Sequence, residues 1–351
     1  MNVLSIVGAR PQFVKAAAVS RALRESHTET LIHTGQHYDE ELSDVFFEEL
    51  AIPQPDHNLG VGSGSHATQT AEMMVRLESV IGDTCPDVVL VYGDTNSTLA
   101  GALVAAKEQT QLAHIEAGLR SGDFSMPEEV NRILTDHCSD QLFAPTEAAK
   151  KNLQAEGITE GVYTPGDVMY DTLLQVRDRL DTVDVIDIPG EFVLATVHRA
   201  GNTNDPDRLA GIVEGLTNCP YPVVLPAHPR TVRALKDFGL WDRATETLDI
   251  VDPIGYLSFI KLIEKARCVA TDSGGVQKEA FYLNTPCVTL RDTTEWTETI
   301  DAGWNVLVGA SAERISAAIR SAGNLPSKPD LYGNGTAASS IVETLEREIE
   351  R

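Results

Sequence analysis

The run Asp87-Val88-Val89-Leu90-Val91-Tyr92-Gly93-Asp94 decides the fold class of this chain. Its uninterrupted apolar centre is typical of a strand that is covered on both faces, as in a parallel sheet. A helix is predicted directly after it, over Ser97–Glu108. Short apolar strands and amphipathic helices alternate on both sides of this run, so the sequence predicts an α/β protein built on doubly wound parallel sheets.

The same alternation gives the other expected elements. Further strands are predicted at Val3–Val7, Thr30–His33, Leu112–Ile115, Gln141–Ala144, Phe192–Val197, Pro222–Leu225, Thr247–Val251, Cys268–Thr271 and Pro286–Leu290. Further helices are predicted at Lys15–Arg24, Thr68–Ile81, Glu128–Cys138, Leu173–Leu180, Asp205–Leu216, Thr231–Phe238, Tyr256–Lys265, Val276–Tyr282 and Ala337–Arg351.

The elements fall into two Rossmann-like domains. The first is expected over residues 1–168 and the second over 169–334, with a terminal helical segment at 335–351. The acidic stretch Asp181–Gly190, which ends in Pro-Gly, is a boundary signal close to this division. Two such domains facing each other leave a cleft at the carboxyl ends of their strands, where open α/β sheets bind ligands.

Composition excludes several classes of protein. The 351 residues include 52 acids and 28 bases, for a net charge of −24, which disfavours binding to nucleic acids. Lys is much rarer than Arg and the acids are dispersed, which fits a halophilic protein in a salt-rich cytoplasm; the alternative is an ordinary acidic soluble protein.

The sequence also indicates a cytoplasmic chain without a membrane segment or a metal site. No apolar run reaches the length of about 18 residues that a membrane span needs, and the N-terminus does not resemble a signal peptide. The five cysteines are far apart and form no Cys-x-x-Cys pair, so neither a disulfide framework nor a bound metal is expected.

The glycine-rich loops indicate a phosphate-binding site rather than a dinucleotide-binding site. The loop Gly8-Ala9-Arg10-Pro11 joins a strand to a helix, and Arg10 and Lys15 add two cations where the helix N-terminus attracts anions. The alternative is a pair of surface cations beside a helix start. The run Gly60–Gly64 lacks the spacing of a dinucleotide fingerprint, so no NAD or other cofactor is expected.

Carboxylates follow the central strands of the first domain. Asp94 comes directly after one strand and Glu116 after the next, while Glu128 and Glu129 open the following helix. Strand ends of a parallel sheet meet at one edge, so these acids are expected at one wall of the cleft. Asp94 is alternatively a helix cap, and one of the paired glutamates is explained by helix electrostatics alone.

The second domain carries a polar rim and a second anion site. His198 and His228 end successive strands, each close to an arginine. The turn Ser273-Gly274-Gly275 then starts a helix, and its exposed amides suit a nucleotide diphosphate. Glu279, further along that helix, is placed to reach a ribose diol; a capped helix after a tight turn is the alternative.

Together these motifs resemble the non-hydrolysing UDP-N-acetylglucosamine 2-epimerase family. The resemblance runs from Gly8 to about Gly335 and is carried by Gly8–Pro11 with Lys15, Gly93–Thr95, Glu116–Arg120, Pro127–Glu129 with Asn131 and Arg132, His198-Arg199, Thr271–Gly275 with Glu279, and Arg291–Glu295. It implies a glycosyltransferase-B-like fold whose last helix packs on the first domain. It also implies a homodimer and a role in polysaccharide or glycoprotein sugar synthesis.

The resemblance further implies a reaction and a set of residues. UDP leaves the anomeric carbon as the carbon 2 proton is removed, and it returns to a 2-acetamidoglucal intermediate after protonation on the opposite face. By family position, Asp94, Glu116 and Glu128 are the catalytic acids, and His198 is a catalytic or phosphate-binding partner. The residues implied to bind the UDP-sugar substrate are Arg10, Lys15, Arg132, His228, Phe259, Ser273, Gly274, Gly275, Glu279 and Arg291.

Two departures from the family pattern argue against regulation by a second substrate molecule and leave two candidate sugars, in that order. The run His37–Asp44 differs from the motif of family members that a second substrate molecule regulates, and Thr294–Glu298 is closer to the branch that acts on UDP-2,3-diacetamido-2,3-dideoxyglucuronate. Three rival functions remain: a glycosyltransferase of the same fold, a hydrolysing epimerase, and a non-enzymatic sensor of nucleotide sugars.

Overall fold

The computed structural model describes residues 1–36, 47–186, 188, 190–323 and 325–350. The chain divides into two compact units, and the first contains Met1–Asp178 together with Asp330–Arg351. The second contains Arg179–Pro329. The run His37–Asp44, in which we expected a departure from substrate regulation, lies outside the described residues.

The first unit is built on a parallel sheet in the order β3-β2-β1-β4-β5-β6-β7. Its strands are β1 Asn2–Val7, β2 Thr28–His33, β3 His57–Asn58, β4 Val88–Tyr92, β5 Gln111–Ile115, β6 Gln141–Phe143 and β7 Val162–Tyr163. Its helices are α1 Arg10–Arg24, α3 His66–Thr84, α4 Asn96–Lys107, α5 Pro127–Cys138, α6 Glu147–Ala155, α7 Val168–Leu180 and α16 Ala337–Ile349.

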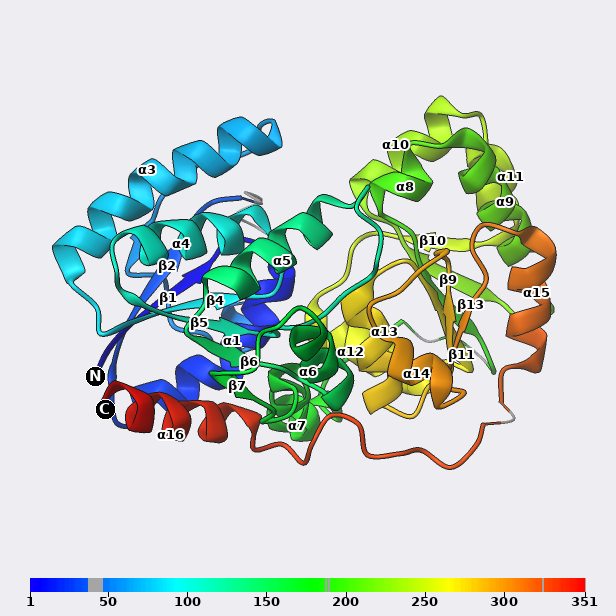
Figure 1. The fold of residues 1–351 in the computed structure, drawn as a ribbon. Coiled ribbons are helices and arrows are strands. Elements are labelled where there is room, and N and C mark those ends of the chain that lie inside the picture. Colours follow the sequence, from blue (N-terminus) through cyan, green and yellow to red (C-terminus); the bar gives the residue numbers. More distant parts are fainter. Residues whose placement is uncertain (37–46, 187, 189, 324, 351) are drawn as a thin grey trace. The chain divides into compact units, whose positions relative to one another are not determined.

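Helices cover both faces of this sheet. The helices α3, α4 and α5 lie side by side on one face, and α1 lies with α16 on the other (Figure 1). Every residue of β4 is buried as a consequence, which is why that strand reads as a continuous apolar run. The side chain of Thr95 caps α4 by accepting from the Thr98 amide, so the chain turns from strand to helix within three residues.

The second unit repeats this plan with the strand order β10-β9-β8-β11-β12-β13, again parallel. Its strands are β8 Val193–Thr196, β9 Val223–Pro226, β10 Asp249–Val251, β11 Cys268–Thr271, β12 Cys287–Thr289 and β13 Asn305–Leu307. Its helices are α8 Ala200–Thr203, α9 Pro206–Thr217, α10 Pro229–Asp237, α11 Trp241–Thr247, α12 Tyr256–Lys265, α13 Gly274–Tyr282, α14 Thr297–Asp301 and α15 Ala312–Ser321. The predicted fold class, two doubly wound parallel sheets, is confirmed.

The boundary between the units differs from the expected one. We placed the second domain at residues 169–334, whereas most of α7 belongs to the first unit. Thr172 in that helix donates to the carbonyl of Val14, and Asp171 accepts from the amide of Ala338 at the start of α16. These contacts hold α7 and the chain from Asp330 onward to the first unit, and sequence periodicity does not reveal them.

Most predicted elements are present with small shifts at their ends. The strand expected from Thr247 starts at Asp249, because α11 runs through Thr247. The sequence did not predict the two-residue strands β3 and β7, the strand β13, or the helices α6, α8, α11, α14 and α15. β3 lies two residues before Gly60, so the Gly60–Gly64 loop follows a short edge strand.

Neither a membrane-spanning helix nor a cluster of metal ligands is present among the described residues. None of the helices there is both long and apolar enough to cross a membrane. Within the same residues, no three or more His, Cys, Asp or Glu side chains are grouped as a metal ion would require.

Candidate functional site

The carboxyl edge of the first sheet brings an acid and a base into direct contact. Lys15 of α1 and Glu116, which follows β5, form an ion pair with 2.5 Å between Nζ and Oε2. Both side chains are less than a tenth exposed, at 8% and 7%. A buried pair of this kind is expensive to desolvate, so it is weak evidence for stability and better evidence for a function.

The backbone around this pair is unusual in two places. Glu116 has φ of 76°, a left-handed conformation that side-chain-bearing residues seldom adopt. Gly93 has φ of 64°, and a Cβ there would lie 2.9 Å from Lys15 Nζ and 3.2 Å from Glu116 Oε2. A glycine is therefore needed at 93 so that the pair can lie against the backbone just before Asp94.

Asp94 is held by α5 but remains partly exposed. Arg132 donates from Nη2 to Asp94 Oδ2 at 2.7 Å, and Asn131 donates from Nδ2 to the Asp94 carbonyl at 2.9 Å. The Arg132 side chain is 2% exposed, whereas that of Asp94 is 27% exposed. The protein thus fixes one side of this carboxylate and leaves another side open to a ligand.

The two glutamates at the start of α5 have different surroundings. Glu129 is buried, binds Arg132, and accepts from the amides of Ser121 and Gly122. Glu128 is half-buried and forms no hydrogen bond or ion pair with another described residue. Glu129 is therefore the acid that holds the local structure, whereas Glu128 has no such role among the described residues.

The first loop, in which we expected a phosphate site, is fixed by Gln12. Gln12, fully buried in α1, accepts through Oε1 from the amides of Gly8 and Ala9. Its Nε2 donates to the Tyr92 carbonyl and to Thr98 Oγ1. The amides of Gly8 and Ala9 therefore already donate to an acceptor within the protein, and the same Gln12 side chain connects this loop to the end of β4. Arg10 is the first residue of α1 and is half-buried.

A buried network behind the acids was not predicted. His114 in β5 places Nδ1 2.7 Å from Asp136 Oδ1 and Nε2 2.8 Å from the Gly93 carbonyl. Arg120 donates to the same aspartate at 2.7 Å. Burial by itself raises the pKa of Asp136, but the hydrogen bond and charge of His114 and the charge of Arg120 hold that pKa below its ordinary value. The network fixes the Gly93 turn. In the sequence, the only sign of this network is a histidine inside a strand.

In the second unit a buried carboxylate joins two strand ends. Asp272, fully buried after β11, accepts from the amides of His198 and Arg199, which follow β8, at 2.9–3.1 Å. It also accepts from Asn202 Nδ2 at 3.1 Å. β8 and β11 are neighbours at the point where the strand order reverses, where open sheets of this kind bind ligands.

The start of α13 presents backbone amides at this edge. Ser273 is the N-cap, and Gly274 and Gly275 are the first two helical residues. A Cβ on Gly274 would lie 2.3 Å from Glu295 Oε1, so no side chain fits there without a shift of that glutamate. Amides of a first helical turn have no acceptor within the helix, and they suit an oxyanion such as a phosphate.

The two histidines differ in what they contact. His198 lies with Nδ1 3.6 Å from Asp272 Oδ1, and its ring centre is 6.2 Å from that of His228. His228 is the N-cap of α10, where its Nδ1 accepts from the Arg230 amide. His228 therefore has a structural role as a helix cap, which the sequence did not indicate.

The remaining predicted residues also belong to the second unit. Arg291, after β12, pairs with Glu295 at 2.9 Å, and the same glutamate lies 3.9 Å from Arg199. Glu279 is buried in α13, and Phe259 is half-buried in α12. Beside Glu279, the buried Lys278 places its ammonium 4.2 Å from the ring centre of Trp296.

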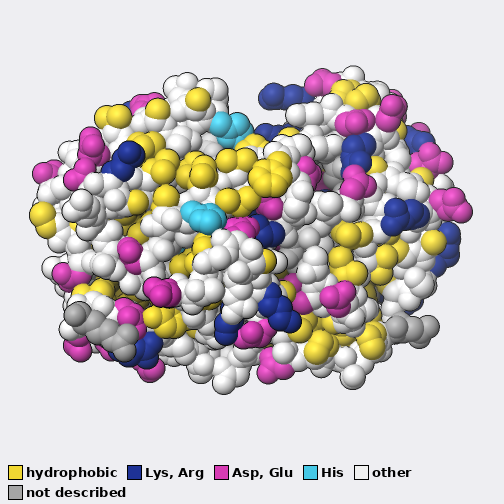
Figure 2. Space-filling view, in the orientation of Figure 1, with side chains coloured by type: hydrophobic (Ala, Val, Ile, Leu, Met, Phe, Trp, Pro, Cys, Tyr) yellow, Lys and Arg dark blue, Asp and Glu magenta, His cyan; other side chains and the backbone are white. Residues whose placement is uncertain are grey.

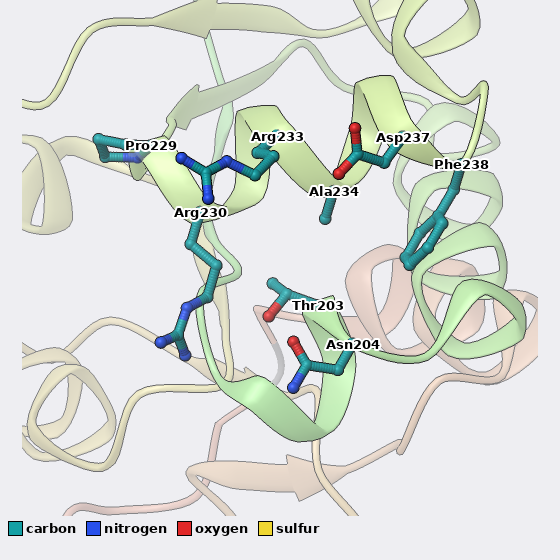
Figure 3. Close-up of a pocket in the computed structure, with 8 residues that line it drawn as sticks. All are labelled: Thr203, Asn204, Pro229, Arg230, Arg233, Ala234, Asp237 and Phe238. Atoms are coloured by element: carbon teal, nitrogen blue, oxygen red, sulfur yellow. The ribbon is translucent and has the colours of Figure 1, made fainter. Parts of the chain in front are cut away.

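A hollow of about 570 Å³ lies between α8 and α10 (Figure 3). Arg230, Arg233 and Phe238 of the α10 segment face Thr203 and Asn204 across it. None of the predicted site residues lines it, although His228 directly precedes Pro229 at its edge. The hollow therefore does not replace the strand-end sites as the candidate for chemistry.

Comparison with known proteins identifies the family of this chain. The family model described as UDP-N-acetylglucosamine 2-epimerase matches residues 21–346. A UDP-N-acetylglucosamine 2-epimerase homolog of Methanococcus maripaludis is 48% identical over 98% of this chain and 99% of its own length. A UDP-2,3-diacetamido-2,3-dideoxy-D-glucuronate 2-epimerase of Pseudomonas aeruginosa is also 48% identical, with the same coverage.

A solved structure has the same fold over the whole chain. The crystal structure of Methanocaldococcus jannaschii UDP-GlcNAc 2-epimerase in complex with UDP-GlcNAc and UDP superposes with a TM-score of 0.91 at 42% identity. The match covers 99% of this chain and 100% of that one. With the family model spanning nearly all of the sequence, this chain belongs to the UDP-N-acetylglucosamine 2-epimerase family.

Proposed function

We propose that this protein inverts carbon 2 of a UDP-linked N-acetyl amino sugar. With the first of two candidate sugars, the reaction interconverts UDP-N-acetylglucosamine and UDP-N-acetylmannosamine. UDP is eliminated from the anomeric carbon, a 2-acetamidoglucal forms, and UDP adds back after protonation of carbon 2 on the opposite face. No metal, hydride or other cofactor takes part in this sequence of steps.

One observation carries the proposal: the buried Lys15–Glu116 pair lies against Gly93, next to an Asp94 that Arg132 holds partly exposed. Loss of UDP gives a transition state with positive charge on the sugar ring, which carboxylates stabilise. Carbon 2 loses and regains its proton on opposite faces, which calls for more than one acid or base. We assign these roles to Asp94, Glu116 and Glu128, with Lys15 and Arg132 near the reacting sugar.

The second unit is proposed to bind the UDP moiety. The amides of Gly274 and Gly275 and the hydroxyl of Ser273 suit the diphosphate, since they open α13. We assign Arg10 and His198 to the same diphosphate. Phe259 is assigned to the uracil, Glu279 to the ribose, and His228 and Arg291 to further contacts with the substrate.

The substituents of the sugar remain open between two candidates. A relative named for UDP-N-acetylglucosamine and one named for the diacetamido glucuronate are equally similar to this chain, at 48% identity. The run Thr294–Glu298 favours the second candidate, because it resembles that branch of the family. The charged pair Arg291–Glu295 borders this run.

The deciding experiment is proton NMR of the enzyme with each sugar in deuterated buffer. We expect one UDP-sugar to convert into its carbon 2 epimer, with solvent deuterium at carbon 2 and no net release of UDP. An epimer without deuterium at carbon 2 would exclude the elimination route. Free UDP with free N-acetylmannosamine identifies a hydrolysing enzyme, a requirement for an acceptor identifies a glycosyltransferase, and binding without turnover identifies a sensor.

We also propose the setting in which the enzyme works. All five cysteines are free thiols, which fits a reducing cytoplasm. The net charge of −24 fits a halophilic protein that requires salt for stability. We infer a homodimer and a role in polysaccharide biosynthesis. Molar salt should raise the unfolding temperature strongly, and no response to salt would remove the halophilic assignment.

A further inference from the structure

Both ring nitrogens of His114 face hydrogen-bond acceptors. The residue is fully buried in β5, which packs against α5 (Figure 1). Its Nε2 lies 2.8 Å from the Gly93 carbonyl oxygen, and its Nδ1 lies 2.7 Å from Asp136 Oδ1. A carbonyl oxygen has no proton to give, so Nε2 must carry one. An ionised carboxylate also only accepts, so Nδ1 carries a second proton unless Asp136 itself is protonated.

The surroundings of Asp136 favour its ionised form. Its Oδ2 accepts from the Gly118 amide at 3.1 Å and from Arg120 Nη1 at 2.7 Å. Hydrogen bonds from a backbone amide and from a guanidinium group both stabilise the charged carboxylate over the neutral acid. The contacts at Oδ2 therefore favour a proton on Nδ1 of His114 rather than on Oδ1 of Asp136.

The balance of charge in this cluster favours the same assignment. Arg120 pairs with Asp136 and also, at 2.6 Å, with Glu156, so one base serves two acids. On the face of the molecule that Figure 2 shows, acidic side chains are scattered over the surface, where water solvates them. The side chain of Asp136 is 0% exposed and depends on partners within the protein. A buried charge is costly unless it is paired, and a protonated His114 supplies the second positive charge.

The hydrogen bond from His114 fixes the peptide group that leads into Asp94. The Gly93 carbonyl belongs to the peptide whose nitrogen is that of Asp94. Beyond it, Asn131 donates to the Asp94 carbonyl and Arg132 to the Asp94 carboxylate. The proposed catalytic acid is thus held on both sides along the chain. A charged donor makes a stronger hydrogen bond than a neutral one, so a protonated ring holds this peptide more firmly.

We propose that His114 carries a proton on both ring nitrogens at neutral pH, and that this buried imidazolium is a positioning residue that holds the Gly93–Asp94 turn for the reaction. The charged groups around it are Asp136 of α5, Arg120 after β5, and the Lys15–Glu116 pair next to Gly93. The effect on turnover rests on the proposed function. The protonation does not, because it is measured without substrate.

NMR of the full chain with ¹⁵N-labelled histidine rings tests the protonation. In the described part of the chain, His33 and His114 are the buried histidines, and His33 Nδ1 accepts from the Gly35 amide. At about pH 8, above the ordinary histidine pKa of ~6.5, we expect one ring whose two nitrogens both carry slowly exchanging protons. Asp136→Asn removes the negative charge beside that ring and should leave it with one proton.

Kinetics test the positioning role. His114→Gln should remove the doubly protonated signal and lower kcat about tenfold with little change in KM, because the peptide before Asp94 loses a charged hydrogen bond. The matched control is His137→Gln. His137 contacts Glu156 at 3.2 Å, and its side chain is 48% exposed. This control should keep both the signal and the wild-type kcat.

Two results would overturn the proposal. A single ring proton on His114 in the wild type would show that the imidazole is neutral, and a folded His114→Gln with wild-type kcat would remove the positioning role. If the variants do not fold, the wild type decides both points. A scalar coupling should then be seen across the hydrogen bond between His114 Nε2 and the ¹³C-labelled carbonyl of Gly93, and its absence would contradict the hold on this turn.

Discussion

The two sheets share a strand order, yet the loops at their carboxyl ends are built differently. In the first unit the acids proposed for chemistry bind side chains, as in the pairs Lys15–Glu116 and Arg132–Asp94. In the second unit, the buried carboxylate of Asp272 binds backbone amides, and glycine opens α13. Side-chain acids can exchange protons, whereas amides offer fixed donors, and this difference is the basis for proposing chemistry in the first unit and binding in the second.

The largest effect is expected from neutralising the acids of the first unit. We expect a loss of turnover of at least ~100-fold in each of Asp94→Asn, Glu116→Gln and Glu128→Gln, because an acid or base group usually contributes that much to the rate. Conversion of the UDP-sugar by proton NMR measures this. Glu156→Gln removes a carboxylate that pairs with Arg120 on the outside of the same unit, and it should leave turnover near that of the wild type. Unchanged turnover in all three acid variants would refute the assignment.

The next effect concerns stability of the second unit. Asp272→Ala leaves the amides of His198 and Arg199 without their acceptor, and we expect a loss of about 2 kcal/mol in the free energy of unfolding. Urea unfolding followed by tryptophan fluorescence reports on this unit, because all three tryptophans belong to it. Asp252→Ala removes an exposed carboxylate of the same unit as a control. Equal urea midpoints for Asp272→Ala and Asp252→Ala would mean that Asp272 does not stabilise the loop after β8.

A smaller effect, on binding alone, is expected at the start of α13. Gly274→Ala places a methyl group where Glu295 Oε1 now lies 2.3 Å away, which displaces the turn. We expect about tenfold weaker binding of UDP by calorimetry, or about 1.4 kcal/mol. Gly201→Ala has no atom within 4 Å of the added methyl group and serves as the matched control. Wild-type affinity in Gly274→Ala would exclude this turn from the UDP site.

The smallest effect at neutral pH is expected at His33. Burial lowers its pKa from 6.5 to about 4, its Nδ1 accepts from the Gly35 amide, and its Nε2 has no partner in the described part of the chain. As pH falls, the His33 side chain therefore takes up a proton in the unfolded state at a higher pH than in the folded state. Between pH 6.5 and about 4, stability of the first unit should fall as pH falls, with a slope of about 1.4 kcal/mol per pH unit from this group.

Amide exchange in β1 and β2 across this pH range measures the contribution of His33. His33→Asn keeps an acceptor near the position of Nδ1 and removes the titration, so it should flatten that part of the profile. A profile identical to that of the wild type would show that His33 does not titrate in this range.

Several features could be predicted because they are local. The central strand Val88–Tyr92 is apolar throughout, and the positions of Asp94 and Glu116 after successive strands are read directly from the sequence. Since parallel strands end at one edge, the two acids had to be neighbours in the fold. The short strands β3 and β7 are two residues long, too short to show any periodicity, and were missed.

The residues that support the site were not predictable in the same way. Gln12 binds the end of β4, and Asp272 binds the loop after β8, in each case across more than 70 positions of sequence. Neither residue type at these positions carries a local signal. For the same reason the boundary at residue 178 was missed, since it depends on contacts of α7 with α1 and α16.

The sequence by itself determined the alternation of strands and helices, the strand-end positions of the acids, and the family, because each of these is set by residues close together in the chain. Only the tertiary structure decided which side of α5 lies inside. Periodicity shows that Val130 and Leu134 share one side and Glu129 and Arg132 another. The choice between them depends on Asp94 and His114, which other strands bring to the helix, and their charges outweigh the burial of two apolar side chains.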